Sequence, residues 1–315
     1  MRRKSKNIVL ENIKLVSAGA KGVAVGRTEE GKTVLVTGAV PGDVVNARVK
    51  KSKSKYFEAE VAEIIEKSPF RVEPKCIHFG VCGGCKWQNL AYEKQLDFKQ
   101  DEVFNHIKRI GGFEDFETQP ILGSTEEYFY RNKMEFSFSN ARWLTQYEIS
   151  SEENFGNRDA LGFHIPGMWS KILDLKECWL QEDPSNFIRL AVKQYAVANG
   201  LEFFDVKEQT GFLRTLMLRQ NSKGEWMVLF QLFREEKENR EKLFDFLLSE
   251  FPQIKTLVYC INSKQNDSIY DQNVETYFGD GFLMEEMDGL KFKIGPKSFF
   301  QTNYKQALEL YRKTL

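Results

Sequence analysis

Short runs of alternating apolar and polar residues fill the stretch from residue 8 to residue 66. Glycines and the sequence Pro41-Gly42-Asp43 interrupt these runs, as turn residues do between strands. The runs predict five strands: Ile8–Leu10, Val23–Val25, Val34–Thr37, Val44–Val49 and Glu58–Ile65. Five short strands so closely spaced are typical of an OB-like closed β-barrel, a shape that often binds single-stranded nucleic acid.

Beyond the barrel, some apolar residues recur with the helical period. They predict helices over residues 90–110, 185–198 and 239–251. Asn89 and Ser185 are placed to cap the first two, and glycines stand after their ends. A further helical pattern runs to Leu315 without a stop signal. The sequence read alone therefore suggests a truncated chain.

Between the helices, residues 120–235 are β-rich. The strand candidates are Phe129–Ser139, Leu161–His164, Ile172–Leu175, Thr215–Gln220 and Trp226–Phe233, with Thr256–Ile261 and a hairpin around Asp288-Gly289 further on. The polar segment Thr145–Arg158 is expected to be an excursion from this β-structure. The prediction is a mixed α+β, multidomain protein.

Three domains are expected. Ser68-Pro69 and Glu73-Pro74 mark the end of the barrel, because proline and its preceding residue interrupt regular structure. We expect a barrel over residues 1–67, a β-rich central domain over residues 68–285, and the beginning of another domain over residues 286–315.

The distribution of charge indicates that the barrel segment is basic. The whole chain has 45 Lys and Arg against 45 Asp and Glu, but residues 1–75 hold 16 against 9. A basic loop carries Lys50, Lys51, Lys53 and Lys55 and leads directly into two aromatic residues, Tyr56 and Phe57. Lysines attract phosphates and aromatic faces stack on unpaired bases, so the loop is a candidate RNA-binding site. The alternative is a solvated hairpin tip whose aromatic residues belong to the core.

The composition also excludes some classes of protein. No apolar run approaches the roughly 20 residues of a membrane span. The basic start leads into no apolar stretch of the kind found in secretory signals. Five cysteines, an odd number, without export features favour the reducing cytoplasm. Nothing in the sequence requires more than a monomer.

The cysteine spacing is the strongest chemical signal. Cys76, Cys82 and Cys85 lie within ten residues, and Cys178 follows far downstream. Structural zinc usually takes two Cys-x2-Cys pairs, whereas an iron–sulfur cluster accepts one tight triplet and a distant fourth cysteine. Zinc, inert cysteines and a ligand role for His78 stay open as alternatives. Cys260 lies in an apolar strand and is expected to be a buried structural residue.

Together, these motifs resemble the iron–sulfur-containing RNA (uracil-5-)-methyltransferases, especially those acting on 23S ribosomal RNA. The first segment looks like a TRAM domain, and the four cysteines match the ligands of a 4Fe–4S cluster. The Tyr130-Arg131-Asn132-Lys133 stretch matches a basic motif of the central domain. The Phe300-Gln301-Thr302-Asn303 stretch resembles the opening of a Rossmann-like methyltransferase domain.

The resemblance implies S-adenosylmethionine as cosubstrate, contacted by Gln301, and RNA as partner, with ribosomal RNA favoured over transfer RNA. Arg131 and Lys133 would contact the RNA. The helix at residues 90–110 would pack with the catalytic domain. The resemblance places a nucleophilic cysteine and a glutamate base after the Gln301 motif, so we expect both beyond Leu315 and the chain itself to be inactive.

Two other functions remain open. A non-catalytic RNA-binding module with a structural iron–sulfur or zinc site would account for the barrel and the cysteines. A redox or radical iron–sulfur enzyme would account for the cysteines alone, although four candidate ligands leave no open iron.

Overall fold

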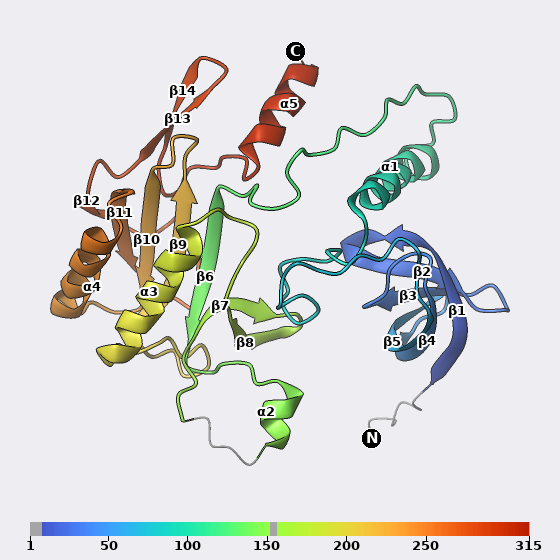
Figure 1. The fold of residues 1–315 in the computed structure, drawn as a ribbon, viewed down its shortest axis with the longest axis horizontal. Helices are drawn as coiled ribbons and strands as arrows, with labels where there is room; N and C mark the ends of the chain where they lie inside the picture. Colours follow the sequence, from blue (N-terminus) through green and yellow to red (C-terminus); the bar gives the residue numbers. More distant parts are fainter. Residues whose placement is uncertain (1–7, 152–155, 315) are drawn as a thin grey trace. The chain divides into compact units, whose positions relative to one another are not determined.

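The alternating runs near the N-terminus form the closed five-stranded barrel that they predict (Figure 1). The computed structural model describes residues 8–151 and 156–314, and for Gln146 and Tyr147 only the backbone. The barrel strands are β1 (Val9–Gly19), β2 (Val23–Arg27), β3 (Thr33–Thr37), β4 (Val44–Ser52) and β5 (Tyr56–Glu66), arranged in the order β1-β2-β3-β5-β4. Inward-facing apolar side chains such as Leu15, Val34 and Val45 are fully buried. Burial of one face is what alternation along a strand produces.

The first strand is much longer than the predicted Ile8–Leu10. It pairs with β4 through its first half and with β2 through its second half, and so closes the barrel. Irregular pairing between Leu10 and Ile13 and between Leu15 and Ser17 bends the strand as it passes from one partner to the other. Such bulges break the alternation of apolar residues, so sequence pattern alone predicts a shorter strand.

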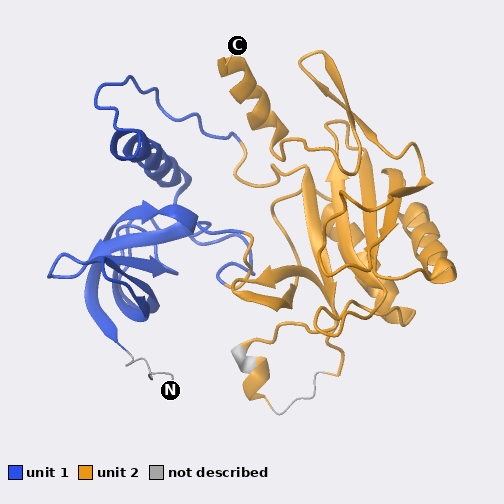
Figure 2. Ribbon diagram, turned by 180° about the vertical axis from the view of Figure 1, so that it is seen from behind, with its two compact units in different colours: residues 1–80, 85–125 blue, residues 81–84, 126–315 orange. Residues whose placement is uncertain are grey.

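The chain forms two compact units (Figure 2). One consists of Met1–Gly80 and Cys85–Thr125, and the other of Val81–Gly84 and Glu126–Leu315. The first unit contains the barrel, the 3-10 turn η1 (Ala20–Gly22) and the helix α1 (Tyr92–Arg109).

The predicted cap of α1 at Asn89 is wrong. The helix is preceded by Ala91, with no side-chain cap. The Asn89 carbonyl instead accepts the Val72 N–H at 3.2 Å, and the Ala91 N–H donates to the Phe70 carbonyl at 2.9 Å. These backbone bonds tie the residues before the helix to the segment that leaves the barrel. Asn89 belongs to this connection and lies too far from the first turn of the helix to cap it.

The second unit is built on a seven-stranded sheet with the order β12-β11-β10-β9-β6-β7-β8. Its strands are β6 (Lys133–Ser139), β7 (Ala160–Ile165), β8 (Met168–Asp174), β9 (Leu213–Gln220), β10 (Trp226–Leu232), β11 (Ile254–Ile261) and β12 (Glu275–Phe278). All neighbours are antiparallel except β10 and β11, which run parallel. The helix α4 (Lys237–Glu250) makes that parallel crossover, as such a connection requires.

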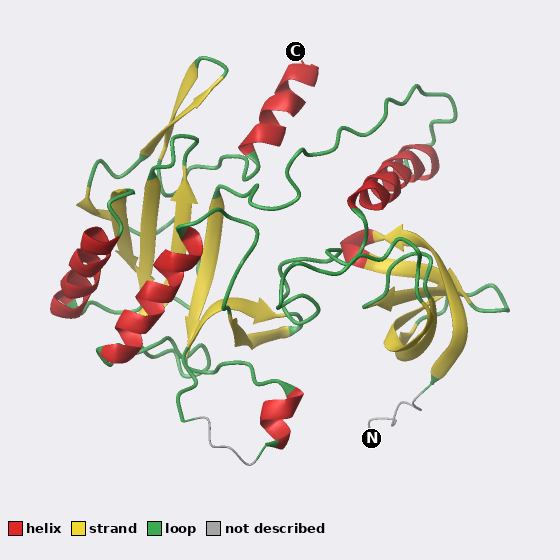
Figure 3. Ribbon diagram, in the orientation of Figure 1, coloured by secondary structure: helices red, strands yellow, loops and turns green. Residues whose placement is uncertain are grey.

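Two helices, α3 (Ser185–Ala198) and α4, cover one face of this sheet (Figure 3). Phe230 of β10 packs against Phe244 of α4, with ring centroids 5.1 Å apart. The other face carries a second buried cluster, formed by Met217, Met227, Leu229, Val258 and Leu283. Both faces are therefore covered, which explains why β9 and β10 read as nearly continuous apolar runs.

The bounds predicted for α3 agree with the structure, but its predicted cap does not. Pro184 precedes the helix, and the Ser185 hydroxyl donates to Gln181 Oε1 at 2.7 Å. The predicted excursion at 145–158 contains the short helix α2 (Gln146–Ser150), and its residues 152–155 lie outside the described part of the chain.

The last described elements are the hairpin β13 (Leu283–Met287) and β14 (Leu290–Ile294), which turns at Asp288-Gly289 as predicted, and the helix α5 (Tyr304–Thr314). Among the described helices, none combines the length and the apolar character that a membrane span needs.

Candidate functional site

Two of the motifs identified in the sequence meet in the second unit. The Asn132 side-chain amide donates to the Gln301 carbonyl at 3.0 Å, and the Asn132 backbone N–H donates to the Thr302 carbonyl at 2.7 Å. The Asn132 carbonyl in turn accepts the Gln220 N–H from the end of β9, at 2.9 Å. Asn132 is 4% exposed, so these bonds form where water competes little. A buried asparagine thus fastens the Gln301 segment to the ends of two inner strands, β6 and β9.

Arg219 of β9 holds the segment that precedes Gln301. This arginine is buried and donates to the Gly295 and Ser298 carbonyls, each at 3.1 Å. Burial lowers the pKa of Arg219, but the guanidinium remains charged because its usual value is far above neutral pH. Charged donors make stronger bonds than neutral ones, so the loop from Gly295 to Ser298 is firmly placed.

Beyond Gln301, the chain turns directly into α5. Asn303 begins the helix: its Oδ1 accepts the Gln306 N–H and its carbonyl accepts the Ala307 N–H, both at 3.0 Å. The Gln301 side chain between these two anchors is exposed. An exposed amide on a fixed backbone can donate to and accept from a small ligand.

Cys178 lies beside the same motif. The N–H groups of Phe129 and Arg131 donate to the Trp179 and Leu180 carbonyls, each at 2.8 Å. The side chain of Asn186 on α3 holds both backbone groups of Cys178: its Oδ1 accepts the N–H at 2.8 Å, and its Nδ2 donates to the carbonyl at 3.1 Å. The backbone of Cys178 is therefore fixed from both sides.

A buried cation stands behind Cys178. Arg189 of α3 is fully buried and donates to the Leu175 carbonyl and to Asn186 Oδ1. Burial lowers the pKa of Arg189 to about 10, against the opposing effect of the Cys178 thiol and two aspartates. The guanidinium is charged at neutral pH, and a positive charge favours the thiolate form of a neighbouring cysteine.

The other three candidate ligands are divided between the units. Cys76 and Cys85 belong to the first unit, and Cys82 and Cys178 belong to the second. Cys82 Sγ accepts the Gly84 N–H at 3.4 Å, and the Cys76 N–H donates to Gln88 Oε1 at 3.2 Å. Within residues 8–151 and 156–314, no group of three or more His, Cys, Asp and Glu side chains is arranged to hold a metal ion.

Cys260 is the buried structural cysteine that the sequence predicts. It lies in β11 and is 1% exposed. Burial raises the pKa of its thiol to about 11, although Lys297 and Arg214 lower it in part. A thiol of this kind is protonated at neutral pH and is therefore a poor nucleophile.

The predicted RNA-binding loop of the barrel, called the basic turn below, comprises the end of β4 with Lys50 and Lys51, the turn itself with Lys53 and Lys55, and the start of β5 with Tyr56 and Phe57. Lys50 pairs with Glu60 at 2.7 Å and Lys51 with Glu58 at 3.2 Å, all on the barrel surface. Lys53 and Lys55 are exposed at the turn itself. Two of the four lysines therefore face carboxylates of β5, with which phosphates must compete.

The two aromatic residues of this turn have different environments. Phe57 packs against the barrel core, and Lys32 Nζ lies 3.7 Å from the centre of its ring. Tyr56 is half-buried at the start of β5. The alternative reading of the aromatic residues, as part of the core, therefore describes Phe57 better than base stacking does.

In the second unit, Lys133 of the basic motif pairs with Glu135 at 2.7 Å, and Arg131 Nε donates to the Lys133 carbonyl at 3.4 Å. No sequence pattern predicts a role for Asn132, Asn186, Arg189 or Arg219. Only Asn132 had a signal, its place inside the Tyr130–Lys133 motif. Buried arginines read from sequence as surface charges, so Arg189 and Arg219 had none, and no pattern singled out Asn186.

Comparisons with known proteins relate the chain to RNA methyltransferases. Residues 13–62 match the family model of the TRAM domain. The chain is 46% identical over 296 residues to a protein of Bacteroides thetaiotaomicron named uncharacterized RNA methyltransferase, which covers 93% of this chain and 65% of that protein. A protein of the same name from Porphyromonas gingivalis is 44% identical over 305 residues, or 95% of this chain and 65% of that protein. The chain therefore spans just under two thirds of the length of these relatives.

The fold is also similar to a solved structure, that of Pyrococcus abyssi tRNA (uracil-54, C5)-methyltransferase in complex with S-adenosyl-L-homocysteine. The TM-score is 0.66 at 26% sequence identity, and the match covers 96% of this chain and 64% of that one. The chain is thus a mixed α/β protein with an N-terminal TRAM barrel, similar to RNA methyltransferases in sequence and to a uracil-C5 methyltransferase in structure.

Proposed function

We propose that the protein carrying these residues transfers a methyl group from S-adenosylmethionine to carbon 5 of a uridine in RNA. The observation that carries the proposal is the structural match, which extends over 96% of this chain and is to a uracil-C5 methyltransferase with S-adenosyl-L-homocysteine bound. The TRAM barrel and the relatives named RNA methyltransferases support RNA as the substrate.

In this proposal, Gln301 contacts the cosubstrate. Its exposed amide lies on a backbone fixed by Asn132 on one side and by the start of α5 on the other. S-adenosylmethionine supplies the methyl group. Asn132 is a positioning residue, because it acts on the cosubstrate through Gln301.

Methylation at carbon 5 of uracil needs an added nucleophile, because this carbon is weakly nucleophilic by itself. A thiolate adds to carbon 6, and carbon 5 of the resulting enolate takes the methyl group from the sulfonium. A base then removes the proton from carbon 5, and the thiolate leaves carbon 6. Cys260 is buried and protonated, so it does not supply that thiolate. The proposal therefore gives binding and positioning roles to the residues of this sequence and assigns the nucleophile and the base to none of them.

We propose further that Cys76, Cys82, Cys85 and Cys178 ligate one 4Fe–4S cluster. Their spacing supports it, as do two local features: the amide N–H donated to Cys82 Sγ and the buried Arg189 behind Cys178. Backbone N–H groups and nearby cations stabilise the thiolates that ligate such clusters. With four cysteine ligands, the cluster has no open iron, and its role is structural.

Iron analysis tests the cluster. Anaerobically purified protein should contain about four iron and four sulfide per chain, the stoichiometry of one 4Fe–4S cluster. Cys178→Ser should lose most of the iron, and Cys260→Ser should keep it. A colourless protein with one bound zinc would refute the cluster.

The RNA substrate that we propose is 23S ribosomal RNA, on the resemblance of the cysteine pattern to enzymes of that kind. Transfer RNA is the second candidate, because the similar solved structure is that of a tRNA enzyme.

We also propose that α1 packs against the methyltransferase domain. Val103 in the helix and Ile110 directly after it are 57% and 79% exposed, and the helix has no buried residue.

The activity is tested with the whole native protein and S-adenosylmethionine carrying a deuterated methyl group. Ribosomal RNA and transfer RNA from cells lacking the gene are offered separately, and their nucleosides are analysed by mass spectrometry. Deuterated 5-methyluridine in ribosomal RNA is the expected product. The same product only in transfer RNA would change the substrate, and label in another nucleoside or in none would refute the proposed reaction.

A further inference from the structure

The hairpin of β7 and β8 contains an unusual bulge. His164 pairs with Ile172, but the next residue of β7, Ile165, pairs with Met168. Trp169, Ser170 and Lys171 are therefore left without partners in the β7–β8 ladder. Bulges of this kind turn side chains out of the sheet and are common beside binding sites. Here, the bulge presents a tryptophan side chain that is 65% exposed.

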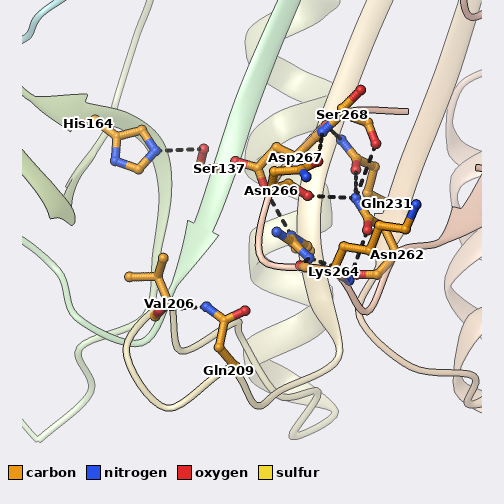
Figure 4. A network of polar contacts seen from close by, with 11 residues as sticks. Ser137, His164, Val206, Gln209, Gln231, Asn262, Lys264, Asn266, Asp267 and Ser268 are labelled. Atoms are coloured by element: carbon orange, nitrogen blue, oxygen red, sulfur yellow. Dashed lines mark hydrogen bonds and ion pairs between the residues drawn. The ribbon is translucent and has the colours of Figure 1, made fainter. Parts of the chain in front are cut away.

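A small recess of about 20 Å³, enough for about one water molecule, lies beside this tryptophan, and its lining includes Ser137, His164, Trp169, Phe204, Val206 and Asp267. Figure 4 shows His164 directed at Ser137, with Val206 and Asp267 contributed by two other loops; His164 Nε2 lies 3.4 Å from Ser137 Oγ. The recess thus combines an aromatic face with hydroxyl, imidazole and carboxylate groups. These are the groups that stack on a nucleobase and hydrogen-bond its edge.

Arg214 gives the recess a rigid wall. It is 2% exposed, donates to Asp267 Oδ1 at 2.8 Å and to the Asn262 carbonyl at 2.7 Å, and lies 4.6 Å from the centre of the Phe204 ring. The network in Figure 4 continues from Asn262 to Gln231, whose side chains are bonded at 3.0 Å. Asp267 is therefore fixed by one oxygen, and 59% of its side chain is exposed at the rim.

Cations gather around the bulge. Arg142 forms a β-bridge with Ile172 and donates its N–H to the Arg158 carbonyl at 2.8 Å, which brings Arg158 next to Lys171. Lys207 is placed by Asp205, which accepts the Lys207 N–H at 2.9 Å. Burial, Arg158 and Lys207 together lower the pKa of Lys171, against the opposing effect of Asp205. Cations that repel one another in this way are stabilised when an anion binds between them.

The nearby carboxylates are already engaged. Glu148 pairs with Arg142 at 2.9 Å, and Asp205 accepts from the Asn140 side chain and from the Lys207 and Glu208 N–H groups. Arg158, whose Nε is buried without a hydrogen-bond partner, donates its NH2 group to the Arg142 carbonyl at 2.7 Å. Arg158, Lys171 and Lys207 are left as a positive edge beside an aromatic surface.

We propose that this edge of the second unit is an RNA subsite, in which a nucleobase of a single-stranded segment stacks on the exposed face of Trp169, with its edge toward the polar rim of the recess, while Lys171 and Lys207 contact the adjoining phosphates. The subsite rests on the proposed function, which supplies RNA as the partner. It is distinct from the basic turn of the barrel, because every residue named belongs to the second unit. An acidic protein would satisfy the cations but not the polar recess beside the tryptophan.

The test uses the 315-residue chain and a fluorescein-labelled, uridine-rich RNA 12-mer, with binding followed by anisotropy. Trp169→Ala should weaken binding about tenfold, the usual effect of losing one stacked base. Trp169→Phe should retain most of the affinity. Phe187→Ala is the matched control, because Phe187 is 59% exposed on α3 of the same unit and should not affect binding.

Salt dependence tests the phosphate contacts. Changing Lys171 and Lys207 to Gln should reduce the slope of log affinity against log salt by about 1.4, at roughly 0.7 per phosphate contact on single strands. Lys255→Gln, at an exposed site on β11, should leave the slope unchanged. The same 12-mer with 5-iodouridine should crosslink to a peptide containing Trp169.

The outcomes separate this subsite from the proposed function. Wild-type binding that Trp169→Ala does not weaken, or crosslinks that avoid the bulge, would refute the subsite and leave the methyltransferase proposal standing. Binding of polyglutamate that competes fully with the RNA and is unchanged in Trp169→Ala would assign the edge to an acidic protein instead. A chain that binds no RNA would contradict both proposals.

Discussion

Each unit contains a long-range contact of a different kind, one made by a charged group and the other by a neutral one. In the first, the buried carboxylate of Asp43 joins the turn before β4 to the segment that leaves the barrel: it accepts the Val40 and Ser68 N–H groups and takes two hydrogen bonds from Arg71, 28 residues away, at 2.8 and 2.7 Å. In the second, the neutral amide of Asn132 reaches a segment 169 residues away. The barrel thus depends on a charge, and the Gln301 segment on uncharged donors and a permanently charged arginine. Acid should therefore weaken the Asp43 contacts and leave the Asn132 contacts unchanged.

The largest effect should come from Asp43→Ala. It leaves the half-buried Arg71 without its carboxylate and two buried N–H groups without an acceptor, and removing one partner of a buried pair costs about 3–5 kcal/mol. We expect the free energy of barrel unfolding in urea to fall by about 3 kcal/mol. Glu60→Gln, which breaks only the exposed pairs with Arg48 and Lys50, is the control and should cost less than about 1 kcal/mol. Equal losses in the two variants would show that the Asp43 contacts do not stabilise the barrel.

The pH dependence should follow the same carboxylate. Burial raises the pKa of Asp43, but the hydrogen bonds from Arg71 and the two N–H groups outweigh it and hold the pKa below the usual 3.8. Such a group stabilises the folded state above its unfolded pKa, and this stability is lost as the pH falls through the folded pKa. Urea unfolding of Asp43→Asn should therefore show a flatter decline below about pH 4 than the wild type. Parallel curves would assign acid sensitivity to other groups.

A smaller effect is expected from Asn132→Ala. The Gln301 carbonyl loses its donor, which costs about 1–3 kcal/mol for a partly buried group. In the whole protein, S-adenosyl-L-homocysteine measured by calorimetry should bind about tenfold more weakly, the equivalent of roughly 1.4 kcal/mol. Asn199→Ala, which removes an exposed amide at the end of α3, is the matched control. An unchanged affinity would show that Asn132 does not position the cosubstrate site.

The smallest change in stability should come from the basic turn. Replacing Lys50, Lys51, Lys53 and Lys55 with Gln should alter the unfolding free energy by less than about 1 kcal/mol, because exposed ion pairs contribute little. The same variant should reduce the salt slope of RNA binding by up to about 2.8, at roughly 0.7 per lysine that contacts a phosphate. A slope equal to that of the wild type would exclude the turn from the RNA site.

The sequence predicts the barrel well, because its signals are local. Alternation, the Pro41-Gly42-Asp43 turn and the short spacing of the strands all act within a few residues. The full length of β1 escapes prediction, because its bulges interrupt the alternation. The bounds of α3 follow from its apolar period and Gly200, but tertiary bonds displace the predicted caps at Asn89 and Ser185.

The candidate site depends on contacts that no local pattern contains. The sequence identifies Gln301 and the Tyr130–Lys133 motif separately, but nothing in the pattern shows that Asn132 joins them across 169 residues. Arg189 and Arg219 are buried by packing that only the assembled sheet provides. The bulge at Trp169 is equally hidden, because its pairing depends on the register of β7 against β8.

Hydrogen exchange of the 315-residue chain tests most directly whether Asp43 stabilises only the first unit and Asn132 only the second. Asp43→Ala should speed exchange in peptides of β1 and β4 and leave the peptide at residues 130–134 protected, where the Asn132 N–H donates to Thr302. Asn132→Ala should do the reverse, releasing that backbone N–H and leaving the barrel unchanged. If either substitution speeds exchange equally in both peptides, or Asn132→Ala leaves residues 130–134 fully protected, the account is contradicted.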